Sequence, residues 1–169
     1  MSHQEHKQSA QALSAHCAII TLSDTRTPQT DRSGQTIQHL LTENGHTLTA
    51  YHLIPDEADQ LIQLVQSLLK RDDVEVIITN GGTGFSPRDR TIDTIQQLFD
   101  KPMPGFGELF RMLSHQQIGA AAMLSRACAG IATNKPIFCL PGSTKAVELA
   151  LTGLILPELR HLLAQLHKH

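Results

Sequence analysis

Short apolar runs alternate along the chain with longer segments in which apolar side chains recur every three or four residues. The runs at residues 18–22, 47–54, 74–78 and 136–140 predict strands, because each is brief and is followed by polar or proline-containing residues. The third run is almost continuously β-branched, a pattern typical of a strand that is covered on both faces.

The segments between these runs predict helices. Ile37, Leu40 and Leu41 share one helix face, with Asp31 or Ser33 available as the N-cap and a glycine just past the end. The clearest helix has a wide apolar face ahead of two cations, and this face consists of Leu61, Ile62, Leu64, Val65, Leu68 and Leu69.

The second half of the chain is less regular. Helices are expected at residues 92–99 and 106–115, and a helical region at 145–167 is expected to kink or restart at Pro157. Residues 119–133 begin with an alanine-rich stretch that favours a helix, and the rest of this segment fits a strand as well.

Strands that alternate with helices predict an α/β fold of three layers, in which helices cover both faces of a mostly parallel sheet. We expect one domain over residues 16–169, preceded by a polar extension at residues 1–15. This order of elements contains no internal repeat and no linker.

Composition and charge narrow the classes of function. Among 169 residues, 14 Lys and Arg stand against 16 Asp and Glu, so the net charge of −2 would gather neither nucleic acid nor an anionic membrane. The sequence has no signal-peptide pattern and no apolar stretch long enough to span a membrane. Cys17, Cys128 and Cys139 form no C-x-x-C pair, so we expect a cytoplasmic protein whose cysteines are reduced packing residues.

The predicted topology indicates where the residues that follow each strand lie in the fold. In a parallel sheet the carboxyl ends of all strands lie along one edge, and α/β proteins bind their ligands in the crevice there. We therefore expect four polar segments to converge on one site. They begin directly after the predicted strands, with Ser23 and Asp24, with Pro55 and Asp56, with Asn80, and with Pro141.

The loop at residues 80–89 is the richest of these segments. Gly81, Gly82 and Gly84, with Thr83 among them, allow left-handed backbone and successive exposed N–H groups, the geometry that cradles phosphate. The spacing is that of neither a P-loop nor a G-x-G-x-x-G fingerprint.

Two charged side chains close the same loop. Arg88 would supply a forked donor for phosphate, and Asp89 an acceptor suited to Mg²⁺. Taken alone, the loop fits an ordinary flexible turn with solvated charges equally well.

Three further positions have two interpretations each. Asp56 either caps the helix that follows it or turns its carboxylate toward the crevice of Asp89. Asp24 is either a turn former or an acid of the site. Ser143 fits an N-cap, while the turn from Gly142 to Lys145 fits an anion site where a strand becomes a helix, and both can hold.

The order of these pieces resembles the molybdenum cofactor biosynthesis family that includes protein B and the molybdopterin adenylyltransferases. The resemblance runs from about residue 18 to residue 163, and six motifs in this order are specific. They are Ser23-Asp24, Pro55-Asp56-Glu57, Gly81-Gly82-Thr83-Gly84 with Pro87-Arg88-Asp89, Pro104-Gly105-Phe106-Gly107-Glu108, Leu124-Ser125-Arg126-Ala127, and Leu140-Pro141-Gly142-Ser143.

The resemblance implies a Rossmann-like, molybdopterin-binding fold that assembles as a trimer or a dimer of trimers. It implies a nucleotidyltransferase that uses Mg-ATP to transfer AMP to the terminal phosphate of molybdopterin and releases pyrophosphate. Such a transfer needs positioning and electrostatics and no covalent protein nucleophile. Other enzymes of the pathway are candidate partners.

Residue by residue, the resemblance makes Asp56 and Asp89 the catalytic acids, with Mg²⁺ as the metal they would hold. The remaining site residues would bind molybdopterin or ATP. They are the matched residues and, from the turn after the last predicted strand, Lys145, namely Ser23, Asp24, Gly81, Gly82, Thr83, Gly84, Arg88, Glu108, Ser125, Arg126, Pro141, Gly142, Ser143 and Lys145.

Two other functions stay open at this point. One is a non-catalytic protein that binds or carries molybdopterin, because a fold alone does not establish a reaction. The other is a nucleotide-binding regulatory or scaffold module, which would bind ATP regardless of the pterin. The sequence does not separate a molybdenum pathway from a tungsten pathway.

Overall fold

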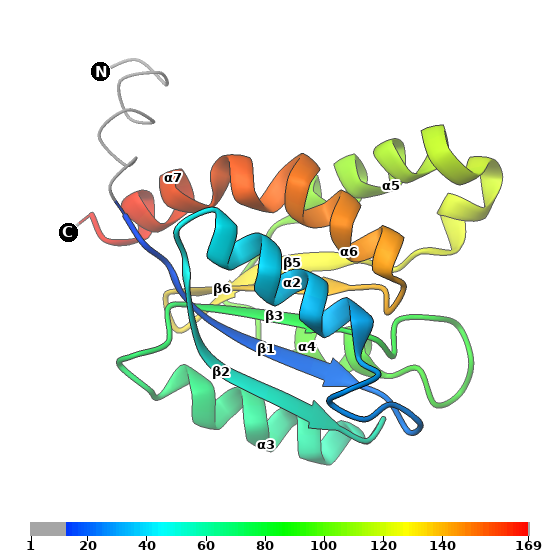
Figure 1. The fold of residues 1–169 in the computed structure, drawn as a ribbon, viewed down its shortest axis with the longest axis horizontal. Coiled ribbons are helices and arrows are strands. Elements are labelled where there is room, and N and C mark those ends of the chain that lie inside the picture. Colours follow the sequence, from blue (N-terminus) through cyan, green and yellow to red (C-terminus); the bar gives the residue numbers. More distant parts are fainter. Residues whose placement is uncertain (1–12, 169) are drawn as a thin grey trace.

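The computed structural model describes residues 13–168, so most of the polar extension expected at residues 1–15 lies outside the described residues. Within them, six strands form one sheet in the order β2-β1-β3-β6-β5-β4 (Figure 1). The parallel strands are β1 (His16–Leu22), β2 (Thr47–Ile54), β3 (Val76–Asn80) and β6 (Lys135–Leu140).

The remaining two strands depart from the parallel pattern. β5 (Cys128–Ala132) runs antiparallel to β6, and the short β4 (Lys101–Pro102) runs antiparallel to β5. The two residues that join β5 to β6, Thr133 and Asn134, have φ of 49° and 61°, which suits a tight hairpin turn. The predicted α/β class with a mostly parallel sheet is confirmed, with an antiparallel edge added.

Helices cover both faces of this sheet (Figure 1). One apolar core lies between the sheet and α2 (Arg32–Glu43), α5 (Pro104–Ile118), α6 (Thr144–Ala150) and α7 (Leu156–Leu166). The other lies between the sheet and α3 (Ala58–Leu69) and α4 (Thr91–Gln96). Alternate residues of β1 supply the two cores, Ile19 on one side and Ile20 on the other, as the two-residue period of a strand requires.

Most predicted helix boundaries agree with the structure. Asp31 caps α2, because its carboxylate accepts a hydrogen bond from the Gly34 N–H at 3.1 Å, and Ser33 is buried inside that helix. Gly45 follows the end of α2 with φ of +80°. The ambiguous segment at residues 119–133 divides into the 3₁₀ helix η1 (Gly119–Leu124) and strand β5.

The terminal helical region restarts where it was expected to. The segment η2 (Leu151–Ile155) is a π turn between α6 and α7, and Pro157 lies in the first turn of α7. Proline suits that position because its missing N–H group has no helical partner there.

The cysteines are free thiols, of which Cys17 and Cys139 are buried as expected. Cys128 is only half-buried, so the prediction that it is a packing residue is wrong in part. It begins β5 and lines a cavity, which leaves one side of the residue open. No helix between residues 13 and 168 is both long and apolar enough to cross a membrane.

Candidate functional site

The carboxyl ends of the four parallel strands lie side by side, as the expected crevice requires. In the sheet register Leu22 is opposite Ile54, Thr21 is opposite Asn80, and Asn80 is opposite Leu140. The segments that follow these strands therefore begin at one edge. The topology also reverses here, because β2 lies on one side of β1 and β3 on the other, which is the arrangement that opens a ligand crevice.

The glycine loop, residues 80–89, crosses this edge in a conformation that requires two of its glycines. Gly81 and Gly82 have φ of +99° and +65°, which side chains rarely adopt. A Cβ atom on Gly81 would collide with the Leu22 carbonyl, and one on Gly82 would lie 2.6 Å from Oδ1 of Asp56. Thr91, the first residue of α4, anchors the loop, since its hydroxyl donates a hydrogen bond to the Gly81 carbonyl at 3.0 Å.

Asp56 faces the glycine loop and does not cap α3. The N-cap of that helix is Glu57, which makes no capping hydrogen bond with its side chain, so the capping interpretation of Asp56 is wrong. The pKa of Asp56 is raised by its burial and, in addition, by the negative charges of Asp89 and Asp24. The structure thus brings the two predicted acids close enough to interact.

Asp89 lies within the loop itself. Its Oδ2 accepts a hydrogen bond from the Ser86 N–H at 3.0 Å, and a Cβ atom on Gly84 would lie 2.7 Å from the same oxygen. The carboxylate therefore shapes the loop, and it is near enough to Asp56 for its charge to raise the pKa of that residue.

A hollow of about 300 Å³ opens beside the loop, and Arg88 on its wall forms an ion pair with Asp24. Arg88 Nη2 lies 2.9 Å from Asp24 Oδ2 and 3.6 Å from Glu57 Oε1. Asp24 Oδ1 accepts a hydrogen bond from the Asp56 N–H at 3.0 Å, so it also holds the turn after β2 in place. We call this region the acidic hollow, lined by residues 56–59, 87, 88 and 90.

The turn after β6 is held at this edge of the sheet by Arg26, a residue that was not predicted from the sequence. Arg26 donates to the Gly142 carbonyl at 2.7 Å and to the Ser33 hydroxyl, while Ser23 Oγ accepts from the Arg26 N–H at 3.1 Å. Ser143 caps α6 by accepting from the Ala146 N–H at 3.2 Å, which confirms the N-cap interpretation.

The rest of this turn is open to solvent to different degrees. Pro141 and Gly142 are half-buried, and Lys145 is exposed in the first turn of α6. A guanidinium group, one lysine and an N-capped turn therefore lie at the same end of the edge.

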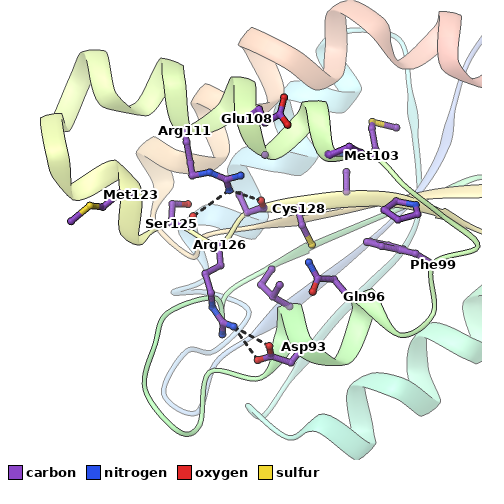
Figure 2. Close-up of a pocket in the computed structure, with 16 residues that line it drawn as sticks. Asp93, Gln96, Phe99, Met103, Glu108, Arg111, Met123, Ser125, Arg126 and Cys128 are labelled. Atoms are coloured by element: carbon purple, nitrogen blue, oxygen red, sulfur yellow. Dashed lines mark hydrogen bonds and ion pairs between the residues drawn. The ribbon is translucent and has the colours of Figure 1, made fainter.

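Arg126 holds the glycine loop from its other side. Its guanidinium donates to the carbonyls of Thr83, Gly84 and Asp89 at 2.7 to 3.2 Å. It also forms an ion pair with Asp93 at 3.0 Å (Figure 2), and it lies over the Phe85 ring at 5.2 Å. Because its N–H groups bind the loop, Arg126 acts on any ligand chiefly by fixing the loop backbone.

A cavity of about 710 Å³ opens on that side of the loop (Figure 2). It lies between α4, α5 and β5, and we call it the large cavity. Among the predicted site residues, Glu108, Ser125 and Arg126 line it. Of the other predicted site residues, Asp56 and Arg88 line the acidic hollow, and the rest line neither of these two hollows.

The direction of β5 explains why Ser125 and Arg126 reach this edge. Residues after a parallel strand lie at the carboxyl edge, but β5 is antiparallel to β6, so residues before it lie there instead. A rule based only on strand ends in a parallel sheet would have missed them.

Further residues of the large cavity were not predicted as site residues. Arg111 donates to the carbonyls of Ser125 and Ala127, at 3.4 and 3.2 Å, and Asp93 holds Arg126. Little in the sequence indicated a role for Arg111 or Asp93, because a charged residue on a helix is usually solvated. At the edge itself, Asn80 is fully buried, and its Oδ1 accepts no hydrogen bond from a described residue.

The residues around the acidic hollow fit a magnesium ion that also binds phosphate. Between residues 13 and 168, no group of three or more His, Cys, Asp or Glu side chains could hold a metal alone. Mg²⁺ is often held by one or two carboxylates together with substrate phosphates and water. Asp56 and Asp89 meet that need, and a cation would relieve the repulsion that raises the pKa of Asp56.

Fold and site together define an α/β protein with a glycine-rich, charged crevice at the carboxyl edge of its sheet. Residues 18–161 match the family described as "Probable molybdopterin binding domain". Over 169 residues the chain is 48% identical to molybdenum cofactor biosynthesis protein B of Bacillus anthracis, and the match covers 99% of each chain. The chain therefore belongs to this family of molybdenum cofactor biosynthesis proteins.

Solved structures agree with the sequence relatives. A crystal structure of molybdenum cofactor biosynthesis protein B shares 47% sequence identity and has a TM-score of 0.91, covering 93% of this chain and 98% of that one. The tungsten cofactor synthesizing protein MoaB from Pyrococcus furiosus shares 32% identity with a TM-score of 0.82, over 92% of this chain and 98% of that chain. The fold implied by the sequence resemblance is thus confirmed.

Proposed function

We propose that the protein is a molybdopterin adenylyltransferase of molybdenum cofactor biosynthesis. It takes Mg-ATP and molybdopterin, transfers AMP to the terminal phosphate of the pterin, and releases pyrophosphate. One observation carries this proposal. The carboxylates of Asp56 and Asp89 both lie against the glycine loop, at Gly82 and Gly84, and are close enough to interact, in a chain of the molybdopterin-binding family.

The acidic hollow is the proposed place of the reacting phosphates. N–H groups of the glycine loop, the Arg88 guanidinium and the turn at Gly142 can balance the negative charge that builds up at phosphorus and on the leaving pyrophosphate. Asp56 and Asp89 would hold Mg²⁺, which supplies charge neutralisation and alignment of phosphate oxygens. The phosphate of the pterin is already ionised at neutral pH, so the protein needs no general base for it.

The large cavity is the proposed place of the pterin. Its volume of about 710 Å³ lies in the range of small-molecule sites, and its wall combines apolar side chains with a few polar groups. Ser125 Oγ is a buried hydroxyl that bonds to no described residue, so it is ready to bind a heteroatom. Glu108 and Arg111 on α5 offer an acceptor and a donor to a ring with both kinds of group (Figure 2).

The experiment that tests the proposal is AMP transfer by the pure protein. Purified molybdopterin and radiolabelled Mg-ATP are supplied in a single-turnover assay, and both pyrophosphate and adenylylated pterin are measured. Asp56→Asn and Asp89→Asn are expected to lower the rate by about 100-fold or more, since each removes charge needed at the phosphates. Asp72→Asn, an exposed carboxylate at the other edge of the sheet, is the matched control.

Two results would contradict the proposal in different ways. Tight binding of molybdopterin without release of pyrophosphate would favour the carrier function. Binding of ATP with the same affinity in the presence and absence of pterin, measured by calorimetry with each ligand, would favour a nucleotide-binding module. An Asp89→Asn variant that folds and transfers AMP at the wild-type rate would remove Asp89 from the mechanism.

We also propose that the chain forms a homo-oligomer, a trimer or a dimer of trimers. Large apolar side chains stay exposed on α5 and η1, and an apolar groove of about 520 Å³ runs between α5 and α7. Contiguous patches of this kind mark association surfaces. The exposed side chains are Leu109, Met112, Ile118, Met123 and Leu124.

Light scattering of the full chain tests the assembly. A mass of three or six times 18.5 kDa is expected, and Met112→Glu should dissociate it, because a charge would be buried in the contact. Gln116→Glu, on the same helix and exposed, is the control. A monomeric wild-type chain at micromolar concentration would contradict this part.

A further inference from the structure

Two of the cysteines lie directly opposite each other in the sheet. Cys128 of β5 and Cys139 of β6 are partners in the antiparallel register, so their side chains emerge on the same face. Opposite residues of such a pair have Cα atoms about 4.5–5.5 Å apart, a separation that falls within the usual range for a disulfide. The two thiols are close enough to shift each other's pKa.

The two thiols differ in access to solvent. Cys139 is fully buried, whereas Cys128 is half-buried and opens onto the large cavity beside Gln96 (Figure 2). The neighbouring thiol of Cys139 and the positive charges of Arg111 and Arg126 lower the pKa of Cys128. The pKa of Cys139 is raised by the neighbouring thiol of Cys128 and by burial. One partner is thus the accessible, more acidic thiol, and the other is its protonated neighbour.

Cys17 has neither property. It is fully buried on β1 in the core on the opposite face of the sheet, and burial raises its pKa to about 12. This cysteine serves as an internal control for any reaction that depends on access to the cavity.

We propose that Cys128 and Cys139 are a redox pair, which a peroxide entering the large cavity converts into a cross-strand disulfide. The Cys128 thiolate attacks one peroxide oxygen, the O–O bond breaks, and the leaving hydroxide takes a proton to form water. The Cys139 sulfur then attacks the resulting sulfenic acid, the S–O bond breaks, and a second water leaves with the Cys139 proton. Two thiols lose two electrons in total, and one peroxide is reduced to two waters.

The bond would act on both hollows through the backbone. Cys128 follows Ser125 and Arg126 closely in the chain, and Cys139 precedes the turn at Gly142. A disulfide would lock the start of β5 to the end of β6 and remove the thiol from the cavity wall. A dithiol reductant restores the open pair, so the modification is reversible. This inference does not depend on the proposed adenylyl transfer.

The test treats the full chain with hydrogen peroxide and follows it by intact mass and peptide mapping under non-reducing conditions. We expect the wild type to lose two hydrogen atoms in mass, to yield a peptide linking Cys128 to Cys139, and to revert with dithiothreitol. Cys17→Ala is expected to behave as the wild type.

Cys139→Ala separates the pair from a single reactive thiol. In this variant dimedone should trap the Cys128 sulfenic acid, and further oxidation to sulfinic acid should be at least about tenfold faster than in the wild type, which resolves to the disulfide first. Sulfinic acid formed equally fast in both proteins, with no linked peptide in the wild type, would overturn the proposal. A linked peptide between Cys17 and either partner would do so as well.

Discussion

The two sides of the glycine loop differ in charge and in shape. On one side, Arg88 lies on the wall of a hollow of about 300 Å³ and pairs with Asp24 and Glu57, and burial together with the charges of Asp89 and Asp24 raises the pKa of Asp56. On the other side, Arg111 and Arg126 lie on the wall of a cavity of about 710 Å³ that is otherwise rich in apolar groups. In the function proposed above, the glycine loop separates the place of Mg²⁺ and the phosphates from the place of the pterin.

The largest effect is expected from removing Arg126, which lines the large cavity and binds the glycine loop. Arg126→Met leaves the carbonyls of the loop without their donor, so the free energy of unfolding should fall by about 2–4 kcal/mol. Asp93→Asn removes only the ion pair to an exposed carboxylate and should cost at most about 1 kcal/mol. Denaturant unfolding measures both, and equal losses in the two variants would show that the loop does not depend on Arg126.

The second test concerns the acidic hollow alone. Gly82→Ala forces a side chain into left-handed backbone and against Asp56, which should lower the free energy of unfolding by about 2 kcal/mol and displace that carboxylate. Gly105→Ala is the control, because a Cβ atom there meets nothing within 4 Å. If Gly82→Ala keeps wild-type stability and wild-type affinity for Mg-ATP, the close fit of Asp56 against the loop has no role.

Two substitutions, one in each hollow, test whether Mg-ATP and molybdopterin bind at different places. Arg88→Met should weaken Mg-ATP binding about tenfold and change molybdopterin binding little, whereas Arg111→Met should do the reverse. Calorimetry with each ligand measures the four affinities. Equal losses for one ligand in both variants would mean that the two hollows act as one pocket.

The smallest expected effect is a shift in the pKa of Asp56. Asp89→Asn removes a negative neighbour, so the pKa of Asp56 should fall toward its ordinary value, as carboxyl NMR of the metal-free protein can measure. A carboxyl group whose pKa is raised by folding favours the folded state when protonated. Its contribution to stability is therefore present below the unfolded pKa and is lost as pH rises through the folded pKa. The variant should show less of that loss, and an unchanged midpoint would contradict the proximity of the two acids.

Much of the fold follows from local patterns in the sequence. The continuous apolar run before Asn80 and the wide face of α3 could only be buried between layers, and both lie where the period of their apolar residues predicts. Asp31 and Gly45 mark the ends of α2 by their capping chemistry. That Asp56 and the glycine loop begin at one edge follows from the parallel direction of the strands, which the alternation of elements predicted.

The rest depends on contacts between distant segments. Nothing local shows that β5 reverses direction, and this reversal is what carries Arg126 and Cys128 to the site. In the sequence Arg26 is one polar residue of a loop, and only the structure shows that it binds the carbonyl of Gly142. Asp56 has the spacing of a helix cap, and only the approach of Gly82 shows that its carboxylate faces the loop.

The π turn at Leu151–Ile155 has a consequence for how the chain tolerates a change of length. The apolar residues of this region recur at intervals of four, a spacing that overshoots one turn of a regular α-helix by about 40° each time. The π turn takes up that surplus, so both halves of the helical region face the same core. Deleting Gly153 should therefore leave a plain α-helix with the buried leucines of α7 still pointing inward, whereas a deletion later in α7 would rotate its end toward solvent. The residues in this repeat are Val147, Leu151, Ile155, Leu159 and Leu163.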